Sequence, residues 1–345
     1  MTHVYLSPDY FQGAVSIEHG TGWVQPWRIQ IERKMLFPSP EGNLLSRASS
    51  PSGVRLRFFS SSPRVKLVLE PLQTEPDEPR IFDLVSDGEI ISTYEQASEE
   101  QEVPFALDNP SGDPERIWEI WMPPFHPVRP KYLVLEDGCS IGALPDSRLR
   151  WTTYGSSITM CRGAHSPART WPAVVSRGLK LNLTSLGYGG QCHLDPMVAR
   201  IIRDLPADVI TVKTGINIFG AASLTARSYQ AALIGLIQSI RDGHPRTPIG
   251  IITAIYSSLH DISEPTINSA GLSLENYREM TRDAFNRLVQ SGDSRLLLFE
   301  GSDLLKPDEA EALKEDGVHP SGEGYELIGK RATEIVLPPL IAMSS

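Results

Sequence analysis

The spacing of apolar residues changes near residue 148, and this change constrains the fold of the 345-residue chain more than any other feature. Before it, apolar and polar residues alternate, as in Val54, Leu56 and Phe58 with Arg55 and Arg57 between them. After it, short apolar runs are separated by segments in which apolar residues recur every three or four positions. The first pattern is typical of half-buried strands, and the second of repeated strand–helix units. We therefore expect two domains, at residues 1–145 and 146–345.

The first half carries many short β-prone runs and almost no helical spacing. These runs lie at 27–31, 54–58, 65–69, 81–85, 89–93, 117–122 and 131–135, and Ser, Pro, Gly and Asp clusters separate them. Surface loops are expected at 71–79 and in the acidic stretch 95–116. Many short strands joined by turns predict an antiparallel β-sandwich of the jelly-roll kind.

The second half predicts an α/β fold. Strands are expected at 149–154, 181–186, 207–213, 248–255 and 295–299. The run from Val209 to Val212 lacks strict alternation, as strands buried on both faces do. Residues such as Tyr229, Leu233 and Ile237 recur at helical spacing between the strands. The prediction is a five-stranded, doubly wound parallel sheet of the flavodoxin-like type, with helices on both faces.

The charge balance argues against some classes of partner. The 32 Lys and Arg residues are outnumbered by 42 Asp and Glu, which gives a net charge of −10, and there is no long basic run. Nucleic acid and anionic membranes are therefore unfavourable partners. No apolar run is long enough for membrane insertion. The N-terminus lacks a basic start followed by an apolar core, so a cytoplasmic location is expected unless a leader was removed. Formation of a homo-oligomer is left open.

The cysteines give no sign of a metal centre. Cys139, Cys161 and Cys192 include no Cys-x-x-Cys pair. Free thiols in a reducing compartment are expected, and a bridge between Cys161 and Cys192 is left open. We expect neither a metal nor a cofactor.

Polar residues with related chemistry follow four of the five predicted strands. Ser157 follows the first strand, a glycine loop ending at Gly190 the second, and Asn217 the third; Asp316 and His319 lie in the loop before the last helix. In parallel α/β sheets the ligand site lies outside the carboxyl ends of the strands. A serine becomes a strong nucleophile when an imidazole takes its proton and a carboxylate orients that imidazole. The sequence thus predicts Ser157 as nucleophile, His319 as base and Asp316 as its orienting group.

The same strand ends offer donors for the negative oxygen of a tetrahedral intermediate. These are the backbone N–H groups of Ser157 and Gly190 and the side-chain amide of Asn217. Glycine allows close approach of the backbone to a ligand. The three groups are predicted to form an oxyanion hole.

Four sequence blocks carry these residues. They are Gly-Ser-Ser-Ile-Thr at 155–159, the glycine loop at 187–190, Gly-Ile-Asn at 215–217 and Asp-Gly-Val-His-Pro at 316–320. In this order and spacing they resemble the SGNH (GDSL-like) hydrolase superfamily, over roughly residues 149 to 340. The preceding sandwich resembles, more loosely, the N-terminal domain of two-domain SGNH esterases, including the carbohydrate esterase family two type.

The resemblance implies the roles already given to Ser157, Gly190, Asn217, His319 and Asp316. The chain departs from the family pattern at two positions, where many members have Asp. These are Ser156 and Ile218, and neither is assigned a catalytic role.

The expected function is that of a serine-dependent carboxylic ester hydrolase that works through an acyl-enzyme. It would remove short acyl groups, such as acetyl, from a carbohydrate or another small hydroxylated metabolite. Arg162, Gln191 and His193, in loops around the site, are expected substrate contacts. Two alternatives are kept: an acyltransferase or thioesterase that uses the same triad, and an inactive protein that binds a carbohydrate or other ligand.

Overall fold

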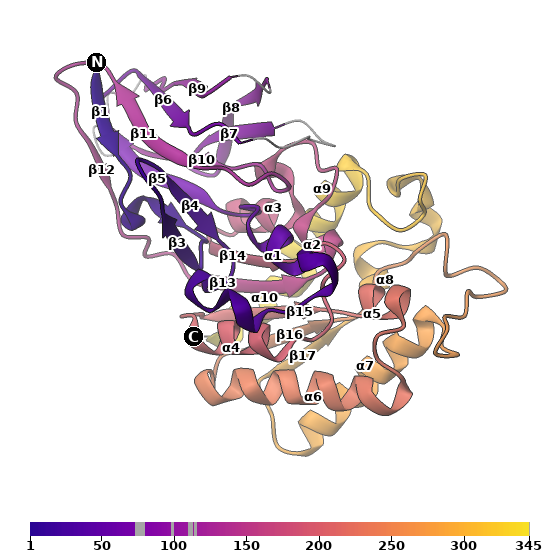
Figure 1. Ribbon diagram of the computed structural model, residues 1–345. Helices are drawn as coiled ribbons and strands as arrows, with labels where there is room; N and C mark the ends of the chain where they lie inside the picture. The colour runs from indigo at the N-terminus through magenta and orange to yellow at the C-terminus, as the bar shows by residue number, and fades with distance from the viewer. Residues whose placement is uncertain (73–79, 98–99, 110–112, 114–115, 345) are drawn as a thin grey trace.

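The computed structural model describes residues 1–72, 80–97, 100–109, 113 and 116–344 (Figure 1). We call residues 1–143 the N-terminal region and residues 150–344 the C-terminal region. Two antiparallel sheets form most of the N-terminal region, as predicted. The first contains, in order, β1 (Thr2–Tyr5), β11 (Pro130–Leu135), β6 (Arg64–Leu69) and β9 (Glu102–Ala106). The second contains β12 (Ile141–Ala143), β5 (Arg55–Ser60), β10 (Ile117–Trp121), β7 (Arg80–Ser86) and β8 (Glu89–Gln96).

Smaller elements complete this region. Strand β2 (Phe11–Gln12) pairs with β5, and β3 (Ser16–His19) forms a hairpin with β4 (Val24–Trp27). The prediction of a surface loop over 95–116 is wrong in part, because residues 102–106 form strand β9, which pairs with β6. Most of the loop predicted at 71–79 lies outside the described residues, as do 98–99, 110–112 and 114–115.

Strand β5 is buried on both faces, which corrects the prediction of a half-buried strand. Leu56 and Phe58 face the core of the sheets and are fully buried, as the alternation predicts. Arg55 on the opposite face is also fully buried, and Arg57 is 7% exposed. The cause is the C-terminal region, which packs against this face: Arg55 donates to the Leu183 carbonyl at 3.0 Å.

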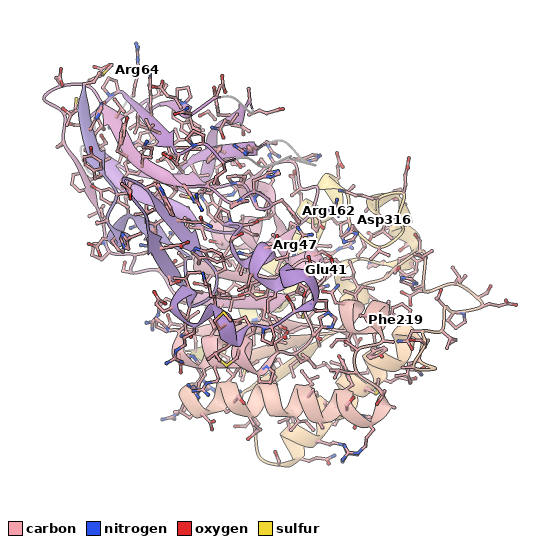
Figure 2. The ribbon with its side chains drawn as sticks, in the orientation of Figure 1. Glu41, Arg47, Arg64, Arg162, Phe219 and Asp316 are labelled. Atoms are coloured by element: carbon pink, nitrogen blue, oxygen red, sulfur yellow. The ribbon has the colours of Figure 1, made fainter. Side chains whose placement is uncertain are left out.

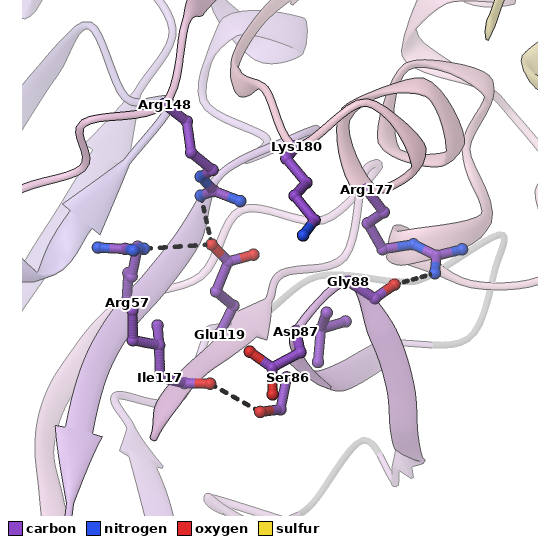
Figure 3. Close-up of a pocket in the computed structure, with 10 residues that line it drawn as sticks. Arg57, Ser86, Asp87, Gly88, Ile117, Glu119, Arg148, Arg177 and Lys180 are labelled. Atoms are coloured by element: carbon purple, nitrogen blue, oxygen red, sulfur yellow. Dashed lines mark hydrogen bonds and ion pairs between the residues drawn. The ribbon is translucent and has the colours of Figure 1, made fainter. Parts of the chain in front are cut away.

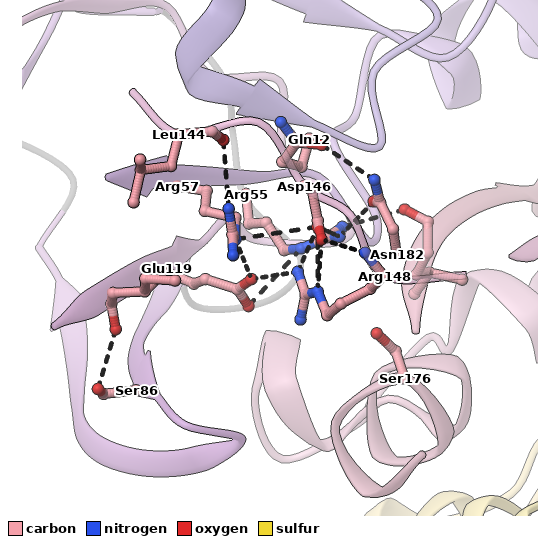
Figure 4. Close-up of polar contacts among 12 residues, drawn as sticks. Gln12, Arg55, Arg57, Ser86, Glu119, Leu144, Asp146, Arg148, Ser176 and Asn182 are labelled. Carbon is pink, nitrogen blue, oxygen red and sulfur yellow. Dashed lines mark hydrogen bonds and ion pairs between the residues drawn. The ribbon is translucent and has the colours of Figure 1, made fainter. Parts of the chain in front are cut away.

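A network of charged side chains fills the contact between the two regions (Figure 4). Arg148 pairs with both Glu119 and Asp146, and the Nε atom of Arg57 lies 3.5 Å from Glu119 Oε1. Arg55 donates to the Asn182 side chain at 2.7 Å. Because each buried charge is stabilised only by its partners, loss of one member leaves the others unpaired. Arg55 joins this network to the C-terminal region through its contacts with Asn182 and Leu183.

The segment between Trp27 and Ser52 differs from the prediction. The strand expected at 27–31 ends with β4 at Trp27, and a 3₁₀ helix η2 (Ile31–Leu36) and a helix α1 (Asn43–Ala48) follow. The buried apolar residues of this segment pack into the core of the C-terminal region instead of the sandwich. They are Ile29, Phe37, Leu44 and Ala48.

The C-terminal region contains the predicted five-stranded parallel sheet. Its order is β14 (Asn182–Gly187), β13 (Arg150–Gly155), β15 (Val209–Lys213), β16 (Ile249–Ile252) and β17 (Leu296–Phe299). All neighbouring strands in it are parallel. The chain order reverses between β13 and β15, so the crevice for a ligand is expected at the carboxyl ends of these two strands.

Helices cover both faces of this sheet. The longer helices fall into two core clusters: α4 (Pro196–Asp204), α6 (Ala226–Gly243) and α7 (Leu274–Gln290) in one, α3 (Trp171–Gly178), α9 (Gly322–Arg331) and α10 (Leu337–Ser344) in the other. The short helices are α2 (Ser157–Met160), α5 (Ile216–Ala221) and α8 (Gly301–Leu304), and a π-helix (Ala332–Val336) joins α9 to α10. Within the described ranges, no helix combines the length and the apolar character needed to cross a membrane.

Candidate active site

Ser157 lies at the carboxyl end of β13 and is the first residue of α2. Ser156 caps this helix, because its hydroxyl accepts a hydrogen bond from the Ile158 backbone N–H at 3.2 Å. Gly155 is needed at the turn, since a Cβ atom there would lie 2.1 Å from Thr159 Oγ1. The turn brings Ser157 to the edge of the sheet, where it remains 8% exposed.

His319 and Asp316 form a continuous line of hydrogen bonds with Ser157. Ser157 Oγ lies 2.8 Å from His319 Nε2, and His319 Nδ1 lies 2.8 Å from Asp316 Oδ2. A neutral imidazole with its proton on Nδ1 satisfies both contacts: Nδ1 donates to the carboxylate and Nε2 accepts from the serine hydroxyl. The Lys314 backbone N–H donates to the His319 carbonyl at 2.8 Å, which closes the loop that carries both residues.

The loop itself keeps the Asp316 carboxylate ionised. Asp316 Oδ1 accepts hydrogen bonds from the backbone N–H groups of Val318 at 2.9 Å and His319 at 2.8 Å. Partial burial acts to raise the pKa of Asp316, but these two bonds and the His319 ring outweigh it and hold the pKa below its ordinary value. We call the hydrogen-bonded line of Ser157, His319 and Asp316 the relay. The Asp316 side chain is 48% exposed, so the relay ends at the rim of the site.

The three predicted oxyanion donors are free to bind a ligand. Within the described ranges, no acceptor is bound to the backbone N–H of Ser157, to that of Gly190 or to the Nδ2 group of Asn217. The Cys192 backbone N–H donates to Asn217 Oδ1 at 3.1 Å, and this bond fixes which end of the amide carries its donors. Gly190 has φ 71°, a conformation that glycine adopts without strain.

Arg28 of the N-terminal region supports the glycine loop, a role that the sequence did not reveal. Its guanidinium is fully buried and donates to the backbone carbonyls of Gly187, Arg47 and Ser50. The Tyr188 hydroxyl donates in turn to the Arg28 carbonyl. Burial lowers the pKa of Arg28 to about 10, which leaves it charged at neutral pH. The N-terminal region thus helps to fix the loop that leads to Gly190.

The three expected substrate contacts have different surroundings. Arg162 is exposed just after α2, and Gln191 is partly buried beside Gly190. Both ring nitrogens of His193 are engaged, with Ser223 Oγ at 2.7 Å and with the Gly190 carbonyl at 3.0 Å. The His193 ring therefore links the glycine loop to the end of α5. Contact of these three residues with substrate stays a prediction.

A pocket lies between the two regions, lined by residues of both (Figure 3). Its lining includes Arg57, Glu119, Arg148 and Lys180. Arg148 precedes the start of β13 and Lys180 precedes the start of β14, whereas Ser157 follows the end of β13. The pocket and the relay therefore lie at opposite ends of the strands, and the pocket takes no part in the candidate site.

Comparison with known proteins finds similarity in both regions of the chain. The model of the GDSL-like Lipase/Acylhydrolase family matches residues 150–335, and that of the SsfX3 N-terminal domain matches residues 9–129. No curated protein gives a significant match. Among solved structures, the salicylyl-acyltransferase SsfX3 from a tetracycline biosynthetic pathway is 30% identical, with a TM-score of 0.85 over 97% of this chain and 98% of that one.

Two further structures share the fold at lower identity. A putative GDSL-like lipase from Bacteroides ovatus is 17% identical, with a TM-score of 0.76 over 99% of this chain and 98% of that one. A family two carbohydrate esterase from Clostridium thermocellum is 15% identical, with a TM-score of 0.58 over 83% of this chain and 92% of that one. The family model covers more than half of the chain, and the alignment to SsfX3 spans nearly all of it. The chain therefore belongs to the GDSL-like lipase/acylhydrolase family.

Proposed function

We propose that this protein is a serine-dependent carboxylic ester hydrolase that works through an acyl-enzyme. One observation carries the proposal: the Ser157–His319–Asp316 line of hydrogen bonds lies at the same strand ends as three donors without an acceptor in the described part of the chain. A nucleophile, its base and a set of free donors are the parts that acyl transfer requires.

The reaction begins when Ser157 Oγ attacks the ester carbonyl carbon while His319 Nε2 takes the hydroxyl proton. The carbonyl oxygen becomes negative and accepts hydrogen bonds from the N–H groups of Ser157, Gly190 and Asn217. Asp316 stabilises the imidazolium that forms. His319 then gives its proton to the departing alcohol as the carbon–oxygen bond breaks, which leaves an acyl ester on Ser157.

Water completes the cycle by the same steps. His319 takes a proton from water as the water oxygen attacks the acyl carbon, and the proton returns to Ser157 Oγ when the acid leaves. Partial exposure supports water as the acceptor: the His319 side chain is 23% exposed and Asp316 lies at the rim. As substrate we propose a short acyl ester, such as an acetyl ester, of a carbohydrate or another small hydroxylated metabolite, by analogy with the family two carbohydrate esterases of this fold.

A second candidate is transfer of the acyl group to an alcohol or amine, from an ester or a thioester. The match to the salicylyl-acyltransferase SsfX3 favours it, because that match extends over both regions of the chain. The two candidates share every step up to the acyl-enzyme and differ only in the acceptor. They are separated by the ratio of transferred to hydrolysed product when a competing alcohol is added.

The test of the proposal is hydrolysis of p-nitrophenyl esters from acetate to decanoate, in the presence of a chelator. Wild type is compared with Ser157→Ala and with Ser302→Ala, a control at an exposed serine in α8. We expect cleavage that falls with chain length, is lost in Ser157→Ala and is unchanged in Ser302→Ala. Equal activity in Ser157→Ala and wild type would refute the proposal.

A fluorophosphonate probe separates the remaining alternative, an inactive binding protein. The proposal predicts a covalent adduct on Ser157 that intact-protein mass spectrometry detects and that Ser157→Ala lacks. Absence of both the adduct and ester cleavage would favour the binding protein.

A further inference from the structure

Arg47 brings a positive charge from the N-terminal region to the glycine loop. It lies in the last turn of α1, and its Cδ and Nε atoms are 3.6 Å from the position that a Cβ atom on Gly189 would take. The next residue, Gly190, carries one of the proposed oxyanion donors. Met160 of α2 lies against the same Cβ position on Gly189, with its Sδ atom 3.5 Å away. In the view of Figure 2, Arg47 lies toward the side that carries Arg162 and Asp316.

The Arg47 guanidinium is available to a ligand. The side chain is partly exposed, and it forms no ion pair or hydrogen bond with any residue that the structure describes. Glu41, an exposed carboxylate on the same segment, does not pair with it. The nearby Arg28, in contrast, is fully buried and bonded to backbone carbonyls. Arg47 therefore has guanidinium donors to offer beside the glycine loop.

The backbone that carries Arg47 is firmly held. Leu44 and Ala48 of α1 are buried in the same core cluster as Leu186 and Tyr188 of the C-terminal region. The Arg28 backbone N–H donates to the Ala48 carbonyl at 2.9 Å, and Arg28 Nη2 donates to the carbonyl of Arg47 itself. Because the backbone is already fixed, binding of a ligand costs conformational entropy only in the Arg47 side chain.

We propose that Arg47 is a specificity-determining residue that binds a carboxylate of the substrate beside the acyl group held at Ser157. A guanidinium presents a planar pair of donors that matches a carboxylate in a bidentate contact. The overall charge of −10 does not attract anions over long distance, so selection of an acidic ester requires a local positive group such as this one. The inference rests on the proposed function, because it assumes an ester bound at Ser157.

The test compares pairs of esters that differ in one carboxylate. On the alcohol side the pair is 3-acetoxybenzoate and its methyl ester; on the acyl side it is mono-4-nitrophenyl glutarate and 4-nitrophenyl pentanoate. For each pair the ratio of kcat/KM for the acidic to the neutral ester is measured in wild type, Arg47→Ala and Arg47→Lys. Arg64→Ala is the matched control, since Arg64 is exposed at the far end of the N-terminal region (Figure 2).

In at least one pair we expect Arg47→Ala to lower the ratio tenfold or more through KM, and Arg47→Lys to restore part of it. Arg64→Ala should leave the ratio as in wild type. Ratios in Arg47→Ala that equal those of wild type in both pairs would overturn the inference, provided that urea unfolding shows an intact fold.

A binding measurement keeps this test separate from the proposed function. Ser157→Ala is titrated by calorimetry with one acidic ester of each kind, 3-acetoxybenzoate and monomethyl glutarate, alone and combined with Arg47→Ala. For at least one of the two esters the inference predicts a Kd at least tenfold weaker in the double variant, whether or not the wild type hydrolyses any ester. Equal affinity of the two variants for both esters would overturn it, while loss of all hydrolysis in wild type would count against the proposed function alone.

Discussion

Replacing Lys213 by Met should stabilise the protein. Lys213 is the last residue of β15 and is 2% exposed. Its titratable neighbours are Cys161, Cys192 and Arg278, and no carboxylate in the described part of the chain pairs with it. Burial lowers the pKa of Lys213 from 10.5 to about 8. Since each pKa unit corresponds to about 1.4 kcal/mol, burial of this charge costs about 3 kcal/mol at pH 7.

The size of the effect should depend on pH. Below pH 8 the lysine is protonated in both the folded and the unfolded chain, so the full cost of burying the charge is present. Between pH 8 and 10.5 the folded protein loses the proton while the unfolded chain keeps it, so the stability of the wild type rises with pH. Met keeps an unbranched side chain that fills the same apolar space. Lys213→Met should thus gain up to about 3 kcal/mol at pH 7 and progressively less above pH 8.

Urea unfolding at pH 7, 9 and 10.5 measures this difference, with Lys330→Met as control. Lys330 is exposed in α9, and its replacement should change the free energy of unfolding by less than about 0.5 kcal/mol. A Lys213→Met variant that is less stable than wild type at pH 7 would refute the reasoning. So would a gain of the same size at pH 7 and pH 10.5, because the charge would then not be its cause.

Two other predictions concern the candidate site, and a third concerns the cysteines. Asn217→Ala should lower kcat by about 10² to 10³, as expected for loss of one oxyanion donor, with little change in KM. Steady-state rates with p-nitrophenyl acetate that match wild type would exclude Asn217 as an oxyanion donor. Asp316→Asn should be less stable than wild type at pH 7 but not near pH 2. The reason is that a carboxylate with a lowered pKa contributes stability that is lost as pH falls through that pKa. Thermal unfolding at both pH values measures the difference in stability. Iodoacetamide at pH 8 should label only Cys139 in the folded protein, and mass spectrometry that finds more than one labelled thiol contradicts this. The two cysteines expected to stay unlabelled are buried, and burial raises the pKa of Cys192 to about 12 and also raises that of Cys161.

The parallel sheet and the relay could be predicted from the sequence because both depend on local pattern. Buried strands leave continuous apolar runs, and the residue after each run marks a carboxyl end of the sheet. Ser157 and His319 are separated by 162 positions, but each follows a recognisable local signal, and the topology of parallel sheets brings such positions together. The same reasoning located Asn217 beside the switch point between β13 and β15.

Contacts between the two regions could not be predicted in this way. Arg55 and Arg57 alternate with apolar residues, which in an isolated sheet indicates a solvent-facing side; only the packing of the C-terminal region against β5 buries them. The segment from Ile29 to Ala48 has no single hydrophobic period, because its apolar residues fill gaps in a core made by other parts of the chain. Arg28 looks like an ordinary surface arginine until the carbonyl of Gly187, 159 residues away, is placed beside it.

These contacts assign different tasks to the two regions. The proposed nucleophile, base, orienting carboxylate and oxyanion donors all belong to the C-terminal region. Arg28 and Ser52 of the N-terminal region donate hydrogen bonds to the backbone carbonyls of Gly187 and Met160, in the glycine loop and in the helix that begins with the proposed nucleophile. The proposed role of Arg47 adds selection of the substrate to this support. A change of the Arg47 side chain can then alter substrate preference without altering the chemistry, because Arg47 is not one of the residues that move protons or carry the proposed oxyanion donors.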